Sequence, residues 1–187
     1  MAGTHVALLR GINVGRAKRI AMADLRALVE DLGYRDVRTL LNSGNVVFTT
    51  PGGVGGAAAA RIEKAMSARL GVSARVTVMT AAELASAVAR NPLGTLARNP
   101  SLMLIAVLRN PDDRSRLAPL AKRDWAPEAL ALGPRVAYLW CPGGSLKGQL
   151  WPAVERALGD AVTTRNWATM TKLHALATDP KGGTSDG

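Results

Sequence analysis

Two stretches of the chain repeat the same order of strands and helices, and this repeat limits the fold more than any other feature. Apolar runs and amphipathic periods predict strands at 5–9, 36–42, 46–49 and 74–79, with helices at 21–32, 57–70 and 80–91. Beyond residue 100 the same patterns predict strands at 101–108, 128–132, 135–140 and 161–164, with helices at 111–120, 150–158 and 166–177. Each half therefore follows the order β-α-β-β-α-β and ends with a further helix.

This order is typical of the ferredoxin-like, or split βαβ, α/β plait. We therefore predict an α+β protein with two ferredoxin-like domains in tandem, each carrying an extra trailing helix. The first domain is expected at residues 1–91 and the second at 101–178. Residues 92–100 contain two prolines and a glycine and are the expected linker. Residues 179–187 are expected to form a disordered tail.

Composition narrows the class of protein. The chain is 48% hydrophobic with only 4% aromatic residues, so we expect a sizeable core built mainly from aliphatic side chains. The single cysteine, Cys141, excludes an internal disulfide and a cysteine-based metal cluster, and it favours the cytoplasm. No apolar stretch approaches the roughly 18 residues of a membrane helix, so no membrane association is expected.

The net charge of +10 predicts a polyanion, an anionic metabolite or an acidic protein as partner. Residues 1–91 carry 12 basic and 6 acidic side chains, and residues 92–187 carry 12 and 8, so no basic tail concentrates the charge. An arginine-rich, solvated surface without a specific partner is the alternative interpretation.

A first group of polar residues surrounds the loop after the first strand. The segment 10–19 contains four basic residues and no acidic one, and it leads to a helix N-terminus, which favours anions. In a plait this loop lies at the same end of the sheet as the 42–45 turn. We therefore predict that Arg10 and Asn13 bind a phosphate or carboxylate together with Asn42, Ser43 and Asn45. The alternative is that the asparagines only satisfy loop backbone groups.

A second basic and polar group is expected at one end of the second domain. Lys147 lies in a glycine-rich loop, and Arg165, Asn166 and Trp167 open the last helix. Trp167 is either a core anchor or a ring that stacks on a planar ligand. The sequence leaves open whether this group and the first one form a single site.

Catalytic and metal-binding constellations are scarce. His5 and His174 have no carboxylate pair around them, so we interpret both as structural or solvent-facing. Cys141 has the features of a small buried residue, and Asp112 and Asp113 those of a helix N-cap. No cofactor or metal is predicted.

Several strings of residues form specific motifs in the order of the chain. They are Val6-Ala-Leu-Leu-Arg-Gly-Ile-Asn-Val-Gly15, the helix Met22-Ala-Asp-Leu-Arg-Ala-Leu28, Val37-Arg-Thr, Asn42-Ser-Gly-Asn-Val-Val-Phe48, Val162-Thr-Thr-Arg-Asn-Trp167 and Thr171-Lys-Leu173. Together they closely resemble one bacterial family, the "domain of unknown function 1697". The resemblance extends from Thr4 to Leu176. It implies a two-part α/β-plait fold without an assigned activity, and its motifs include Arg10, Asn13, Asn42, Ser43, Asn45 and Arg165–Trp167.

One departure from the family pattern lies in the glycine-rich loop. Relatives usually have a Gly-Arg-Ser-Lys-Leu-like string, whereas this chain has Leu146-Lys-Gly-Gln-Leu150. Lys147 can replace the first basic residue, but Gly148 and Gln149 replace the Ser-Lys pair. If that pair is catalytic in relatives, this protein is impaired.

Three functions are compatible with these residues. The favoured hypothesis is a binding module for an anionic small molecule or a nucleic acid. A nucleic acid would be bound through its phosphates, since the strands lack the aromatic residues that stack on bases. The second is a metal-free enzyme acting on a small anionic substrate, with a hydroxyl such as that of Ser43 or Thr164 in the chemistry, although no base is evident. The third is a homo-oligomeric scaffold.

Overall fold

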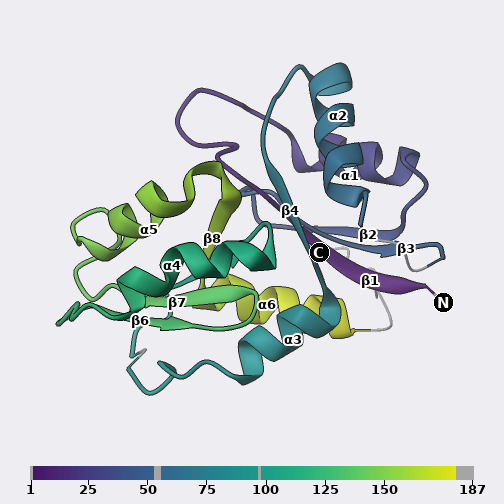
Figure 1. Ribbon diagram of the computed structural model, residues 1–187. Coiled ribbons are helices and arrows are strands. Elements are labelled where there is room, and N and C mark those ends of the chain that lie inside the picture. Colours follow the sequence, from purple (N-terminus) through teal and green to yellow (C-terminus); the bar gives the residue numbers. More distant parts are fainter. Residues whose placement is uncertain (1, 53–55, 97, 180–187) are drawn as a thin grey trace. The chain divides into compact units, whose positions relative to one another are not determined.

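The computed structural model describes residues 2–52, 56–96 and 98–179 (Figure 1). The chain folds into two compact units, one formed by Met1–Ala81 with Lys172–Gly187, and the other by Ala82–Thr171. Each unit contains one four-stranded antiparallel sheet. The prediction of a fold that mixes helices with strands is therefore confirmed, and the two sheets are consistent with two α/β units in tandem.

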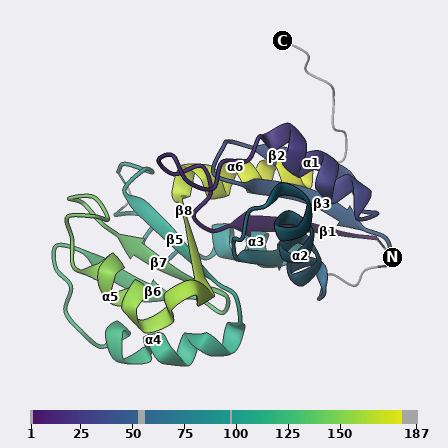
Figure 2. The same ribbon diagram turned by 90° about the horizontal axis from the view of Figure 1, so that it is seen from above.

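The first unit builds its sheet in the order β2-β3-β1-β4. Helices α1 and α2 lie together on one face of this sheet (Figures 1 and 2). They bury aliphatic side chains such as Leu25 and Ile62 against Phe48 and Tyr34, whose rings lie 4.8 Å apart. The elements are β1 (Gly3–Leu9), α1 (Met22–Asp31), β2 (Arg35–Leu40), β3 (Asn45–Thr50), α2 (Ala58–Leu70) and β4 (Val76–Thr80).

The second unit repeats this arrangement in the order β6-β7-β5-β8. Helices α4 and α5 cover one face of its sheet through Leu117, Leu150 and Val154, which pack against strand residues such as Ala106 and Leu139. The elements are α3 (Ala81–Ala89), β5 (Met103–Leu108), α4 (Arg114–Ala121), β6 (Ala129–Leu132), β7 (Val136–Trp140), α5 (Leu150–Leu158), β8 (Val162–Asn166) and α6 (Trp167–Thr178).

The boundary between the units differs from the linker expected at 92–100. Helix α3 belongs to the second unit except for Ala81, and α6 passes into the first unit at Lys172. The buried Tyr138 hydroxyl donates to the Ala87 carbonyl at 2.7 Å, which attaches α3 to β7. At the other helix end, Arg38 donates to the Asp179 carbonyl at 3.5 Å. Residues 180–187 of the expected tail lie outside the described residues.

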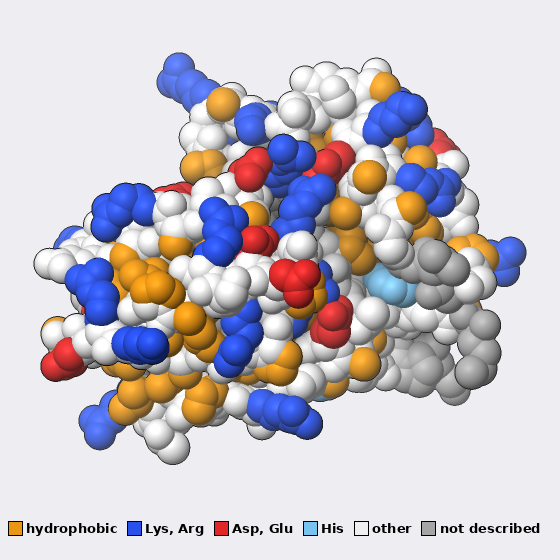
Figure 3. Space-filling model, viewed as in Figure 1, with side chains coloured by type: hydrophobic (Ala, Val, Ile, Leu, Met, Phe, Trp, Pro, Cys, Tyr) orange, Lys and Arg blue, Asp and Glu red, His pale blue; other side chains and the backbone are white. Residues whose placement is uncertain are grey.

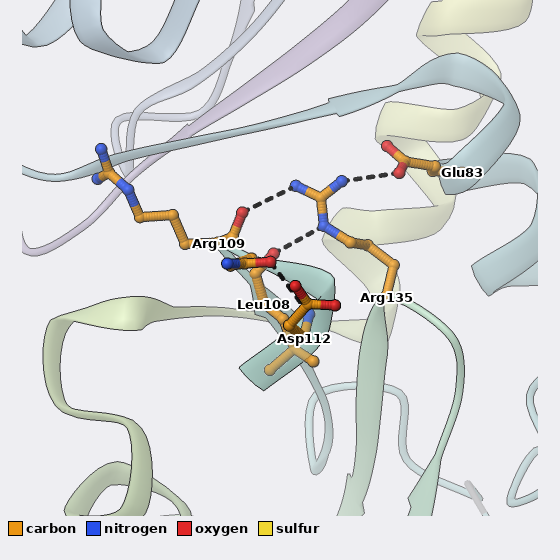
Figure 4. Close-up of polar contacts among 6 residues, drawn as sticks. Glu83, Leu108, Arg109, Asp112 and Arg135 are labelled. Carbon is orange, nitrogen blue, oxygen red and sulfur yellow. Dashed lines mark hydrogen bonds and ion pairs between the residues drawn. The ribbon is translucent and has the colours of Figure 1, made fainter. Parts of the chain in front are cut away.

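Arg135, which directly precedes β7, provides a second attachment of α3 (Figure 4). Its Nη1 donates to Oε1 of Glu83 on α3 at 2.7 Å, and only 14% of the Arg135 side chain is exposed. Its Nε donates to the Leu108 carbonyl at 2.7 Å, and Nη2 donates to the Arg109 carbonyl at 3.4 Å. One guanidinium therefore donates hydrogen bonds to backbone carbonyls at the end of β5 and also forms an ion pair with the Glu83 carboxylate of α3.

The predicted helix cap at Asp112 and Asp113 is corrected by the structure. Asn110 is the cap, because its Oδ1 accepts from the Asp112 backbone N–H at 3.0 Å at the start of the 3₁₀ turn Pro111–Asp113. Asp113 makes no side-chain cap to α4 and pairs instead with Arg116 at 3.2 Å. Asn110 precedes a proline, which fixes the first turn and leaves the Asp112 N–H as the donor that needs an acceptor.

Two features are absent from the described part of the chain. Within it, no helix is both long enough and apolar enough to cross a bilayer. The same residues contain no group of three or more histidine, cysteine, aspartate or glutamate side chains that could hold a metal ion.

Candidate functional site

Two loops meet at one end of the first sheet, and they contain the first predicted group of polar residues. The backbone N–H of Leu9, at the end of β1, donates to the Gly44 carbonyl at 2.9 Å. Leu8 pairs with Asn45 across β1 and β3, so the 10–20 loop and the 41–44 turn leave the sheet side by side. A side-chain bond from Asn13 to the Asn42 carbonyl, at 2.7 Å, joins the two loops directly.

Asn13 braces the basic loop. Its Oδ1 accepts from the Ile20 N–H at 2.8 Å, and its Nδ2 donates to the Ile20 carbonyl at 2.9 Å in addition to Asn42. Both amide protons of the side chain are thus bound to backbone carbonyls. These bonds match the alternative interpretation, in which the asparagines satisfy backbone groups of the loop.

Asn45 has a similar role inside the turn. Its side chain is fully buried, and its Nδ2 donates to the Leu40 carbonyl at 2.7 Å and to Oγ of Ser43 at 2.9 Å. The amide closes the β2–β3 connection from within. Ser43 and Asn42 are exposed at the tip of this turn, so these two residues of the predicted group remain on the surface.

The basic side chains of the loop project outward. Arg16, Lys18 and Arg19 are exposed, and none of them pairs with a carboxylate in the described residues. Arg10 is half-buried, and its backbone N–H donates to the Arg75 carbonyl at 2.9 Å. Other lysine and arginine side chains are dispersed over the visible face of the molecule (Figure 3). The loop differs from that background because it carries no acidic residue.

Unusual backbone conformations concentrate in the same two loops. The described chain has four non-glycine residues with positive φ, and three of them lie here: Asn13 (54°), Lys18 (51°) and Leu41 (59°). Between Gly11 and Gly15 the sign of φ alternates, since Gly11, Asn13 and Gly15 are positive. Such alternation is typical of backbone nests that bind anions. Left-handed conformations of residues with a Cβ are costly, and they cluster at functional sites.

The second predicted group lies at one end of the second sheet. Trp140, which ends β7, pairs with Met103, and Asn166, which ends β8, pairs with Leu104 on the other side of β5. Asn166 is the N-cap of α6, because its Oδ1 accepts from the Thr169 N–H at 2.9 Å. Trp167 is the first residue of this helix and is half-buried. Asn166 therefore has a structural task that the sequence did not assign to it.

Arg165 and Lys147 have different environments. Arg165 is partly buried, and burial lowers the pKa of its guanidinium to about 10, which leaves it charged at neutral pH. Its Nη1 donates to the Thr164 carbonyl at 2.8 Å. Lys147 is exposed and lines a cavity whose other lining residues include Arg123 and Glu128, but not Arg165 or Trp167. Arg123 and Glu128 were missed by the sequence analysis, since no motif or spacing connects them to Lys147.

His5 and Cys141, for which no catalytic role was predicted, are both buried in the core. His5 is buried, stacks on Phe48 at 5.8 Å and bonds the Gly3 carbonyl through Nδ1 at 2.9 Å. Cys141 is also buried. Burial raises the pKa of its thiol to about 12, and the negative charge of Glu128 acts in the same direction. A thiol in this environment stays protonated at neutral pH and is a poor nucleophile.

Alkaline pH is therefore expected to destabilise the protein partly through Cys141. The thiol ionises near its ordinary pKa of about 9 in the unfolded chain and near 12 in the folded protein. The contribution of Cys141 to the free energy of unfolding is therefore fully present below about pH 9 and is lost as the pH rises toward 12. The loss is at most about 1.4 kcal/mol per pH unit. Urea unfolding between pH 8 and pH 11 should show a flatter decline for Cys141→Ala than for the wild type. Equal slopes would contradict this role.

Comparisons with known proteins agree with the fold and assign no activity. A family model described as "Protein of unknown function (DUF1697)" matches residues 2–138. A conserved bacterial protein from Streptococcus pneumoniae has a solved structure that matches with a TM-score of 0.74 at 18% identity, covering 95% of this chain and 99% of that one. At this identity the likeness shows the fold alone. A search of curated proteins found no match. The family match includes both loops of the first unit and ends before Lys147.

Proposed function

The chain belongs to the DUF1697 family of proteins of unknown function, and we propose that it is a binding module for a phosphate-bearing anion. The proposed contact surface is the basic loop, residues 10–20, together with the adjoining 41–44 turn. The observation that carries the proposal is the outward projection of Arg16, Lys18 and Arg19, unpaired with carboxylates in the described residues, from a loop that Asn13 braces.

The exposure of this surface favours an extended ligand. Residues Val14 to Arg19 are all exposed, and Val14 and Leu41 expose 71% and 52% of their surfaces. Cations spread along an exposed loop can each meet a different phosphate of a polymer, which is how nucleic-acid backbones are bound without sequence readout. Base stacking on the sheet is disfavoured, because Phe48 is buried and packed against Tyr34. We therefore favour a nucleic-acid backbone over a small metabolite at this surface.

We also propose that each unit is a ferredoxin-like plait and that the protein works in the cytoplasm. The strand orders β2-β3-β1-β4 and β6-β7-β5-β8 support the first statement, since each central strand is flanked by two antiparallel neighbours and two helices cover one face. The single buried cysteine supports the second.

The proposal predicts salt-dependent binding that depends on where the charges lie. Fluorescence anisotropy would be measured with labelled duplex DNA and single-stranded RNA over a range of salt concentrations. Three phosphate contacts give a log–log slope on duplex DNA of about −2.7, and the triple variant Arg16→Gln, Lys18→Gln, Arg19→Gln should lose most of that slope.

The matched control removes the same charge elsewhere in the first unit. Arg35, Lys64 and Lys172 are exposed and form no ion pair within the described residues. The corresponding triple glutamine variant should bind as the wild type does. Equal losses in the two triple variants would mean that net charge alone causes binding, and absence of wild-type binding at low salt would exclude a nucleic acid.

A further inference from the structure

The second unit contains a cavity that the proposed function does not use. It has a volume of about 350 Å³ and lies between the 123–128 segment and the glycine-rich loop 142–149. That volume is at the lower end of the range of small-molecule sites, roughly 300–1,000 Å³, so a polymer is not its natural ligand. Its walls combine apolar residues such as Trp125, Pro127 and Pro142 with the charged side chains of Arg123 and Lys147.

The two cations of the cavity have no carboxylate partner in the described part of the chain. The Arg123 guanidinium lies 4.3 Å from the centre of the Trp125 ring, and this ring is fixed by a bond from its Nε1 to the Leu120 carbonyl at 2.8 Å. Lys147 is exposed on the opposite segment. Neither charge appears in an ion pair with a described residue.

Each of the two carboxylates in the lining has one oxygen that accepts from the backbone. Oδ1 of Asp124 accepts from the Ala126 N–H at 3.0 Å. Oε2 of Glu128 accepts from the N–H groups of Gln149 and Leu150, at 3.0 and 3.1 Å, where α5 begins. The acidic groups therefore shape the cavity, while the basic groups keep their hydrogen-bonding capacity for a ligand.

Glu128 also explains why glycine occupies position 148. A Cβ added at Gly148 would overlap Oε1 of Glu128, which is itself buried. The carboxylate thus holds the end of the glycine-rich loop against the 123–128 segment and sets the position of Lys147. Glu128 is therefore a positioning residue.

We propose that this cavity binds a small organic phosphate, with Arg123 and Lys147 contacting the phosphate and the apolar walls contacting the organic part. Arg123 can engage two phosphate oxygens at once, and Lys147 adds a mobile point charge. The contact of Arg123 with Trp125 holds the guanidinium in place before the ligand arrives, which lowers the entropic cost of binding. The site is separate from the basic loop and does not depend on the function proposed for it.

Isothermal titration calorimetry with phenyl phosphate tests the proposal on the full chain. The wild type should bind it more tightly than inorganic phosphate, which lacks the apolar part, and more tightly than benzyl alcohol, which lacks the charge. Arg123→Gln and Lys147→Gln should each weaken binding at least about tenfold. Lys147 is exposed, so its variant tests the site even if loss of the Arg123 contact with Trp125 disturbs the fold.

Two controls separate this cavity from the basic loop. Lys122→Gln removes the neighbouring charge, which does not line the cavity, and it should bind phenyl phosphate like the wild type. The Arg16, Lys18, Arg19 triple variant should do so as well. Absence of wild-type binding up to about 10 mM, equal binding of benzoate, or a loss in the loop variant with none in Lys147→Gln would each overturn the proposal.

Discussion

Replacing Gly44 by alanine is expected to lower the free energy of unfolding by about 3 kcal/mol, whereas the same change at Gly33 should cost about 1 kcal/mol. Both glycines have a positive φ, 83° and 90°, so both substitutions place a Cβ in a conformation that alanine disfavours. They differ in the space around them. The two variants therefore separate backbone strain from a packing clash.

The clash at Gly44 involves the start of the basic loop. An added Cβ would lie 2.7 Å from Cδ1 of Ile12 and 2.8 Å from Cβ of Leu9, whereas nothing lies within 4 Å at Gly33. The Ile12 side chain can rotate, but Cβ of Leu9 moves only with the backbone of β1. Because Leu9 donates to the Gly44 carbonyl, relief of the clash would also weaken the bond that aligns the two loops.

Unfolding by guanidinium, followed by circular dichroism and by tryptophan fluorescence, measures this effect. All four tryptophans lie in the second unit, so fluorescence reports on that unit while circular dichroism reports on both. Gly44→Ala should lower the midpoint observed by circular dichroism. Equal midpoints for the Gly44 and Gly33 variants would show that the loop yields to the extra methyl group without cost.

Hydrophobic periodicity was sufficient to predict the order of elements in both units. Helix α5 is Leu150–Leu158, as its apolar stripe indicates, and α1 and α2 begin and end within one residue of their expected limits. The grouping of α3 could not be inferred in the same way. It depends on Tyr138 and Arg135, which reach Ala87 and Glu83 from more than fifty positions along the chain, and local patterns contain no information on such contacts.

The roles of the residues in the candidate site were also only partly predictable from the sequence. Topology brought the 10–19 segment next to the 42–45 turn, because a plait puts both at one end of the sheet. It could not separate ligand-binding from positioning residues, since that depends on whether an amide proton is already bound to a carbonyl. Asn13 and Asn45 have such bonds, and Asn166 caps a helix. The cavity at Lys147 could not be predicted from the sequence, because no motif or spacing connects Arg123 and Glu128 with Lys147.

Asn13 offers the second large effect, and it connects the stability of the loop with its function. Asn13→Ala is expected to cost about 3 kcal/mol, from three lost hydrogen bonds to backbone groups and from a positive φ that asparagine tolerates better than alanine. Asn13→Gly loses the same bonds but adopts the same φ without strain. The alanine variant should therefore be the less stable of the two by about 1 kcal/mol.

Asn13→Asp tests the donors separately from the acceptor. The variant keeps an oxygen for the Ile20 N–H, but its second oxygen faces the carbonyls of Ile20 and Asn42, where the amide now donates. Repulsion between these oxygens should make Asn13→Asp at least as destabilising as Asn13→Ala. Guanidinium unfolding followed by circular dichroism gives the three free energies. Stability of the aspartate variant close to that of the wild type would contradict the claim that the bonds donated by Asn13 stabilise the loop.

The same variants reveal what the brace contributes to binding. Asn13→Gly leaves Arg16, Lys18 and Arg19 in place, so the charge that attracts a polyanion is unchanged. If the brace presents these cations in one arrangement, the glycine variant should bind nucleic acid more weakly at every salt concentration while keeping the slope, because the number of phosphate contacts is the same and only the cost of ordering the loop has risen. If Asn13 itself contacted the ligand, binding would weaken by more than the loss of stability accounts for. Measuring both quantities on one variant therefore decides between a ligand-binding and a positioning role for Asn13.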